Sequence, residues 1–160
     1  MNELLQEYAL IAEIISGIAI IISLIFVGIQ IKRNTKATQA SAFQNIADLD
    51  INLLLNFGNS KELAQLISTF RENPDALTQE EQNQGFYLFG AEVRHVENLF
   101  LQYENKMLSE KHWQSRKALV DGIVLSGGFG ALLKHPFRKY FDGSFIEYGI
   151  GQRQKMGIEE

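Results

Sequence analysis

Four polar side chains interrupt an otherwise apolar stretch, ALIAEIISGIAIIISLIFVGIQI, at residues 9–31. They are Glu13, Ser16, Ser23 and Gln30. A carboxylate, two hydroxyls and an amide are costly in an apolar environment unless each finds a hydrogen-bond partner, an opposite charge or water. These four residues are therefore the first candidates for a functional surface.

The four residues belong to one series with alternating steps of three and four, which keeps them on one face of a helix. We call this series the polar stripe: Glu13, Ser16, Ile20, Ser23, Val27, Gln30 and Asn34. We expect it to contact other copies of the chain or a partner membrane protein, or to line a pore. The alternative places Glu13 near the outer membrane surface and bonds the serines back to their own helix.

A second group with potential chemistry is Glu-Val-Arg-His at residues 92–95, followed by Glu97. Di-iron helical bundles use two Glu-x-x-His pairs together with two further carboxylates. This chain has one such pair, so we favour ion pairs involving Glu92, Arg94, His95 and Glu97. No catalytic motif, metal site or cofactor site is predicted. If the protein were an enzyme, Glu92, His95 and Glu97 would be the candidate residues.

Two further motifs lie near the C-terminus. Ser-Gly-Gly-Phe-Gly at residues 126–130 lacks the Gly-Lys-Ser/Thr ending of a phosphate-binding loop, so we expect it to end a helix. A basic cluster is interleaved with aromatic residues: Lys134, His135, Phe137, Arg138, Lys139, Tyr140 and Phe141. It could contact anionic lipid headgroups, but a solvated face above an aromatic core is the favoured interpretation.

The apolar stretch is long enough to cross a membrane. As a helix, its 23 residues span roughly 34 Å, compared with a hydrocarbon core of about 30 Å. A core helix of a soluble protein is rarely apolar around its whole circumference, and a signal peptide begins with basic residues. We therefore predict a transmembrane helix with its flanks at residues 1–36 and a cytoplasmic helical bundle at residues 37–160.

The flanking charges predict the orientation of this span. Lys32, Arg33 and Lys36 follow it, and no Lys or Arg precedes it. The positive-inside rule then places the N-terminus outside and the C-terminal domain in the cytoplasm. We also expect these three side chains to contact lipid headgroups.

The rest of the chain is predicted to be helical throughout, so the fold class is all-α. We expect the first helix to continue to Gly58, and Ser60, Thr78 and Ser109 to begin three further helices. A last helical segment is expected at residues 137–148. One face of the first helix beyond the membrane is apolar and should dock the bundle: Phe43, Ile46, Leu49, Leu53 and Phe57.

Composition excludes several classes of function. The chain has no cysteine, which excludes disulfides and thiolate metal sites. Three of the 19 acidic residues and none of the 15 basic ones lie in the first 31 residues, so the remainder is nearly balanced in charge. That balance gives no electrostatic footprint for nucleic acid.

Two segments carry a resemblance to known proteins: SLIFVGIQIKRNTKATQASAFQ at residues 23–44 and VENLFLQYENKMLSEKHWQSRKAL at residues 96–119, followed by a late Phe-x-x-Tyr. In these segments the chain resembles a group of small uncharacterised bacterial single-span membrane proteins. That group has an N-terminal transmembrane helix and a helical cytoplasmic domain. The resemblance implies the bacterial inner membrane and assigns no activity.

Together these observations lead us to expect a self-assembling single-span inner-membrane protein. It would act as a non-enzymatic homo-oligomeric scaffold or as a pore, with the polar stripe at the interface between subunits. The alternative is a regulatory or sensor subunit that binds another membrane protein.

Overall fold

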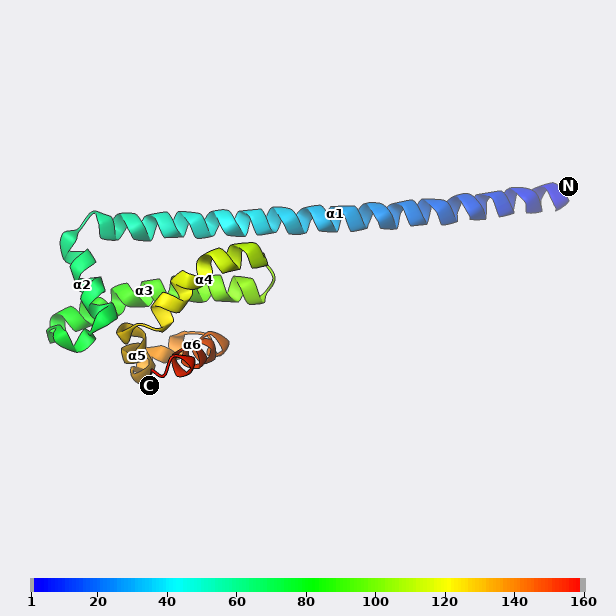
Figure 1. Ribbon diagram of the computed structural model, residues 1–160. Coiled ribbons are helices and arrows are strands. Elements are labelled where there is room, and N and C mark those ends of the chain that lie inside the picture. Colours follow the sequence, from blue (N-terminus) through cyan, green and yellow to red (C-terminus); the bar gives the residue numbers. More distant parts are fainter. Residues whose placement is uncertain (1, 159–160) are drawn as a thin grey trace. The chain divides into compact units, whose positions relative to one another are not determined.

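The all-α prediction is confirmed by the computed structural model of the chain, which describes residues 2–158 (Figure 1). Across this range there are six α-helices, two short 3₁₀ helices and no β-strand. The chain divides into two compact units, Met1–Ala40 and Ser41–Glu160. We call the second unit the helical domain.

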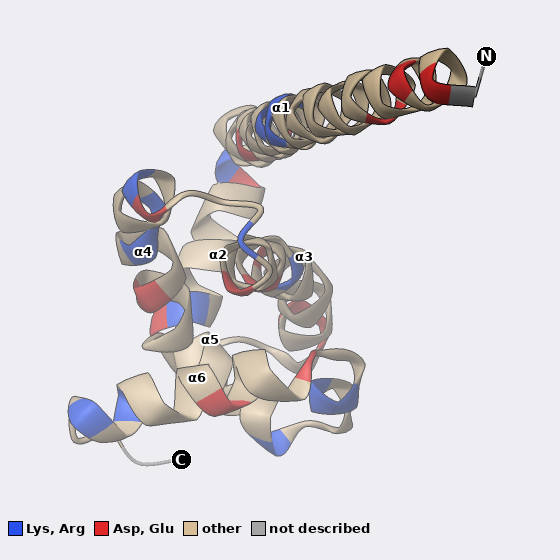
Figure 2. Cartoon of the chain, turned by 90° about the vertical axis from the view of Figure 1, so that its right-hand side faces the viewer, with Lys and Arg blue, Asp and Glu red and all other residues tan. Residues whose placement is uncertain are grey.

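Helix α1 (Asn2–Gly58) belongs to both units, with residues 2–40 in the first and residues 41–58 in the helical domain. No proline occurs in it, which allows one helix of this length. Figure 2 shows a long run of α1 without charged residues. The remaining elements all lie in the helical domain: α2 (Lys61–Glu72), η1 (Pro74–Ala76), α3 (Gln79–Glu104), α4 (Glu110–Val124), α5 (Gly127–Lys134), η2 (Pro136–Tyr140) and α6 (Gly143–Lys155).

The three predicted helix starts are confirmed. The side chain of Ser60 accepts a hydrogen bond from the backbone N–H of Leu63 and caps α2. Thr78 and Glu81 form a reciprocal capping box at the start of α3, and Ser109 caps α4. Each cap satisfies a backbone N–H that has no partner inside its own helix.

Two expectations near the C-terminus are wrong. The glycines at residues 127–130 do not end a helix, because α4 already ends at Val124 and Ser126 caps the new helix α5. These glycines permit close packing instead: a Cβ on Gly127 would lie 2.6 Å from the backbone oxygen of Glu72. The segment at residues 137–148 is also not a single helix, because Asp142 caps α6 immediately after η2.

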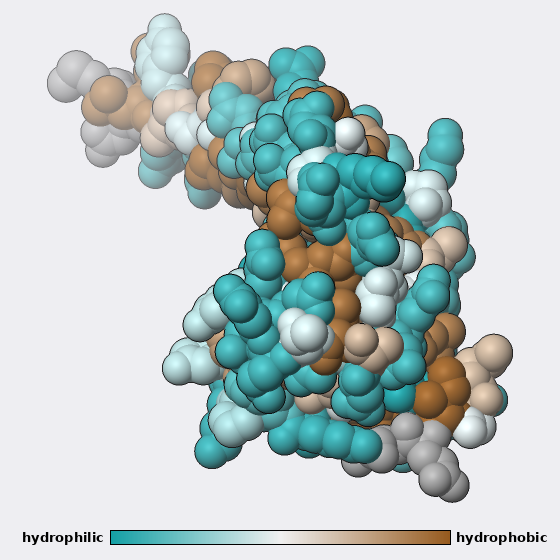
Figure 3. All heavy atoms as spheres, turned by 90° about the vertical axis from the view of Figure 1, so that its left-hand side faces the viewer, coloured by the Kyte–Doolittle hydropathy of each residue, from teal (hydrophilic) through white to brown (hydrophobic). Residues whose placement is uncertain are grey.

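Helix α3 is central to the helical domain and contacts α2, α4, α5 and α6. Its buried apolar residues form one side of the core: Phe89, Val93, Val96, Leu99 and Phe100. The only tryptophan of the chain, Trp113 of α4, is buried and stacks on Tyr103 at a ring-centroid distance of 4.6 Å. Figure 3 shows that hydrophilic side chains predominate on one face of the domain, with apolar side chains gathered in patches.

We predict that Gly85→Ala destabilises the helical domain by about 1–3 kcal/mol, the usual cost of overpacking a core. Gly85 lies in α3, and a Cβ there would be 2.3 Å from Cδ2 of the buried Phe70 ring. The fluorescence of Trp113 during urea unfolding of the full chain measures this loss.

The control is Gly122→Ala in α4, where an added Cβ meets nothing within 4 Å. We expect this change to be neutral or to stabilise the domain by about 0.5–1 kcal/mol, because alanine loses less backbone entropy in a helix. Equal unfolding midpoints for the two variants would contradict the packing at Gly85.

Candidate functional site

The polar stripe lies on the first part of α1, where all seven of its side chains are exposed in the single chain. The hydroxyl of Ser16 donates a hydrogen bond to the backbone oxygen of Ala12 at 2.7 Å, so this group is satisfied within its own helix. Glu13, Ser23 and Gln30 have no side-chain hydrogen bond or ion pair with any residue in the range 2–158. Three of the four polar groups thus lack a partner in the described chain.

The apolar side chains around the polar stripe are also exposed in the single chain. A single helix cannot bury its own side chains, and the large apolar residues of this segment are exposed, among them Ile18, Ile21 and Phe26. Among the described residues, α1 is the one helix long and apolar enough to span a membrane. The basic residues Lys32, Arg33 and Lys36 follow on the same helix and are exposed.

The part of α1 inside the helical domain is held by its predicted apolar face. Ile46 is fully buried, and Phe43 and Phe57 pack against the core. Phe43 also stacks on the His112 ring of α4, with ring centroids 4.3 Å apart. Leu49 of the same face remains exposed.

Asp50 of α1 joins three helices through its carboxylate. Its Oδ1 lies 2.7 Å from Nε2 of His95 in α3, and its Oδ2 forms an ion pair with Arg116 of α4. Asp50 was not predicted from the sequence, although its position along the helix contained a signal. Asp50 lies between Ile46 and Leu53 at helical spacing, so it is a charged residue on a face that docks into a core.

Glu92 of α3 forms a second buried ion pair, with Arg71 of α2. Nε of Arg71 donates to Oε2 of Glu92 at 3.0 Å, and Nη2 of Arg71 pairs with Oε1. Burial raises the pKa of Glu92, and the hydrogen bond and charge of Arg71 offset only part of that effect. Glu92 therefore forms an ion pair between helices, and His95 contacts a carboxylate of another helix. Neither pairs with the other members of the cluster favoured from the sequence, Arg94 and Glu97.

Glu97 of α3 belongs to a third network on a different side of the helix. Its Oε2 pairs with Arg94, and its Oε1 accepts the backbone N–H of Asp142 at 2.5 Å. Arg94 also donates to the backbone oxygen of Tyr140 at 2.6 Å. Within residues 2–158, no group of three or more His, Asp or Glu side chains is arranged to hold a metal ion.

A pocket of about 330 Å³ lies where the first two ion-pair networks meet. We call it the arginine pocket. Its charged lining consists of Asp50, Arg71, Glu92, His95 and Arg116. Its apolar lining comes from the end of α1 and from α3 and α4, and includes Leu53, Phe57, Leu119 and Ile123. Apolar walls with a few converging polar groups are typical of sites for small molecules.

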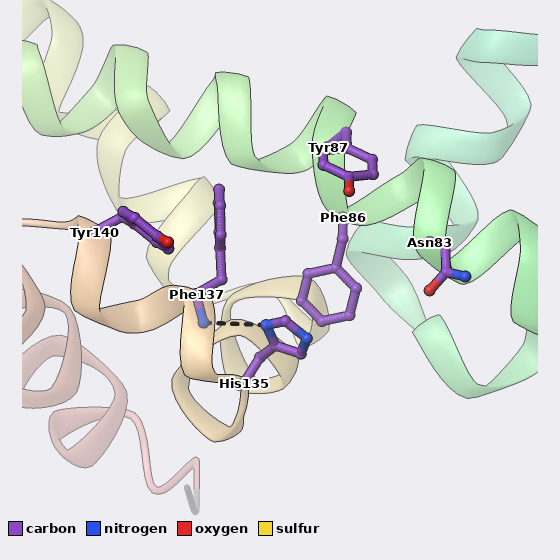
Figure 4. A pocket seen from close by; sticks show the side chains of 6 residues that line it. All are labelled: Asn83, Phe86, Tyr87, His135, Phe137 and Tyr140. Carbon is purple, nitrogen blue, oxygen red and sulfur yellow. Dashed lines mark hydrogen bonds between the residues drawn. The ribbon is translucent and has the colours of Figure 1, made fainter.

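A second pocket, of about 570 Å³, is lined mainly by aromatic rings from α3 and η2 (Figure 4). Its lining residues are Asn83, Phe86, Tyr87, His135, Phe137 and Tyr140. Nδ1 of His135 accepts the backbone N–H of Phe137 at 3.1 Å, and its ring lies 4.5 Å from that of Phe86.

The basic cluster next to this aromatic pocket faces solvent. Lys134, Arg138 and Lys139 are exposed, whereas Phe141 is buried. Exposed basic side chains are compatible with both a solvated face and contact with lipid headgroups, so the choice between the two stays a prediction.

Comparisons with known proteins leave these sites to be interpreted from their geometry alone. No protein-family model matches the chain, and no curated protein or solved structure is significantly similar to it.

Proposed function

We propose that this protein is a single-span membrane protein that assembles with copies of itself through the polar stripe. The observation that carries the proposal is the set of polar groups on the apolar part of α1 that have no partner in the described chain. Hydrocarbon cannot satisfy a carboxylate, an amide or a hydroxyl, so a neighbouring helix or water must do so.

The exposure of the apolar side chains supports the membrane span. A core helix of a soluble protein would be mostly buried, but none of the most apolar 18-residue window of α1 is buried within the chain. Lys32, Arg33 and Lys36 support an orientation with the helical domain in the cytoplasm, since basic residues accumulate on that side. In a bacterial cell this membrane would be the inner membrane. A reporter fused after Glu160 should then behave as cytoplasmic.

Self-assembly is the simplest source of a partner for the stripe, because it needs no second protein and most soluble oligomers are symmetric homo-oligomers. Gly17 and Gly28 have open space where a Cβ would lie, which permits close helix approach. No Lys or Arg lies within the span to pair with Glu13. A ring of copies would bring the Glu13 carboxylates together, so such a ring would contain water or cations, as in a pore. A tightly packed seam would make the protein a scaffold.

The second candidate function is a regulatory or sensor subunit that binds another membrane protein. It is favoured by Asp50, which connects α1 directly to α3 and α4 beside the arginine pocket. A change in that pocket would act on the helix that continues into the apolar segment.

The test of self-assembly is the mass of the purified chain in lipid nanodiscs or mild detergent. We expect a defined homo-oligomer, and we expect Ser16→Leu, Ser23→Leu and Gln30→Leu in combination to weaken it at least tenfold. Each polar contact between membrane helices is worth about 0.6–2 kcal/mol. The matched control, Ile18→Leu, Ile22→Leu and Ile25→Leu, changes three residues off the stripe and should leave the mass unchanged. A monomeric parent chain would exclude self-assembly and favour the regulatory subunit. An oligomer unaffected by the stripe variant would show that the stripe faces lipid.

A further inference from the structure

The arginine pocket has the features of a binding site that is independent of the polar stripe. All of its lining residues lie in the helical domain, on α1, α2, α3 and α4. Its volume, about 330 Å³, is at the lower end of the range of small-molecule pockets. The pocket is therefore large enough for a ligand of modest size.

Hydrogen-bond donors exceed acceptors among the charged groups of this pocket. A guanidinium group has five N–H donors. Arg71 uses Nε and Nη2 on Glu92, and Arg116 uses Nη1 on Asp50, so the other N–H groups of both side chains have no partner in residues 2–158. Both oxygens of Glu92 pair with Arg71, and Oδ1 of Asp50 lies against His95. Oδ2 of Asp50 accepts no hydrogen bond but forms the ion pair with Arg116. What the pocket lacks is an acceptor, which an anionic group would supply.

Both arginines are accessible to such a group, with side chains 39% exposed for Arg71 and 27% for Arg116. His95 adds a further polar atom. His95 is more than nine-tenths buried, and its Nδ1 has no hydrogen-bond partner among the described residues.

The apolar walls of the pocket favour an anion that carries a hydrocarbon group over a bare inorganic ion. Leu53, Phe57 and Ile123 line the pocket beside the charged groups, and the exposed side chains of Leu54 and Leu119 extend this apolar surface. A small ion would leave these walls in contact with water. An apolar chain attached to the anionic group would cover them and gain the free energy of apolar burial.

We propose that the arginine pocket binds a small amphiphilic carboxylate. Its head group accepts N–H bonds from Arg71 and Arg116, and its hydrocarbon chain lies against Leu53, Phe57 and Leu119. This proposal goes beyond self-assembly and does not depend on it. A divalent cation is a poor fit, because each carboxylate oxygen of the pocket lies against an arginine or histidine side chain.

The probe is octanoate, titrated by calorimetry into the full chain in nanodiscs of uncharged phospholipid, with empty nanodiscs subtracted. We expect saturable binding of one octanoate per chain. Acetate lacks the hydrocarbon chain and octanol lacks the charge, so each should bind at least tenfold more weakly. Absence of saturable octanoate binding, or equal binding of octanol, would overturn the proposal.

Two leucine variants distinguish octanoate binding in the pocket from partition of octanoate into the lipid. Leu119→Trp fills the pocket from an exposed position, 42% accessible, without touching an ion pair, and should weaken octanoate binding at least tenfold. The matched control is Leu55→Trp, at a leucine that is 55% accessible and does not line the pocket. It should leave binding unchanged. Equal affinities for octanoate in the two variants would place the ligand elsewhere.

Discussion

Asp50→Ala is expected to lower the free energy of unfolding of the helical domain by about 3 kcal/mol, within the range for breaking a buried ion pair. The change removes the carboxylate that pairs with His95 and Arg116 at once. The His95 side chain is 6% exposed, so its Nε2–H would stay buried without an acceptor. A buried unsatisfied donor costs about 1–3 kcal/mol by itself, and the guanidinium of Arg116 loses its only ionic partner among residues 2–158.

The loss should be greatest where α1 meets the rest of the domain. Asp50 provides the ion pairs that join residues 41–58 to α3 and α4. Amide hydrogen exchange in this segment should therefore accelerate more than exchange in α3. The unfolding midpoint comes from Trp113 fluorescence in urea, as for the glycine variants.

Asp48→Ala is the matched control, two residues away on the same helix. Asp48 is exposed, and its carboxylate accepts only a long hydrogen bond, 3.4 Å, from Gln44. Surface changes of this kind usually alter stability by less than about 0.5 kcal/mol. If the Asp48 and Asp50 variants were equally stable, Asp50 would not join the three helices in the way described.

The second large effect is an asymmetry between the two partners of the Arg71–Glu92 pair. Arg71→Gln leaves the Glu92 carboxylate, 6% exposed, without a cationic partner, and should cost about 3 kcal/mol at neutral pH. Glu92→Gln leaves only Arg71, whose side chain is 39% exposed and can turn to water. We expect that variant to lose about 1 kcal/mol or less, the worth of one hydrogen-bonded pair near the surface.

The pH dependence of these two variants follows from the raised pKa of Glu92. A carboxyl group whose pKa is higher in the folded state binds its proton more tightly there. Its contribution to stability is therefore present at acid pH and is lost as the pH rises through the raised pKa. Arg71 offsets part of this loss in the natural chain, so Arg71→Gln should become progressively less stable than the natural chain as the pH rises from the ordinary pKa of a glutamate, about 4.3, toward neutral pH.

Urea unfolding at several pH values checks this expectation, with Glu92→Gln as the control. Glu92→Gln has no titrating group at residue 92. The difference between the unfolding free energies of Glu92→Gln and Arg71→Gln should therefore widen as the pH rises. A constant difference across this range would show that Glu92 does not carry a buried charge.

The sequence alone was sufficient for features that depend on neighbours along the chain. The caps of α2, α3 and α4 could be predicted because Ser60, Thr78 and Ser109 bond to N–H groups three residues away. The all-α fold followed from hydrophobic spacing, and the apolar stretch of α1 from hydropathy. The apolar face of residues 41–57 was predictable in part for the same reason, because Ile46 is buried and Phe43 and Phe57 pack against the core.

Only the tertiary structure decided which charged groups meet. The sequence identified Glu92, His95 and Glu97 but not their partners, since Asp50 lies 45 residues from His95 and Arg71 lies 21 residues from Glu92. Spacing along one helix says nothing about a carboxylate brought in by another. The same limit explains the error at residues 126–130, where close packing on α2 requires glycine inside a helix. The arginine pocket exists because four helices converge there, and that convergence depends on long-range packing that no local pattern encodes.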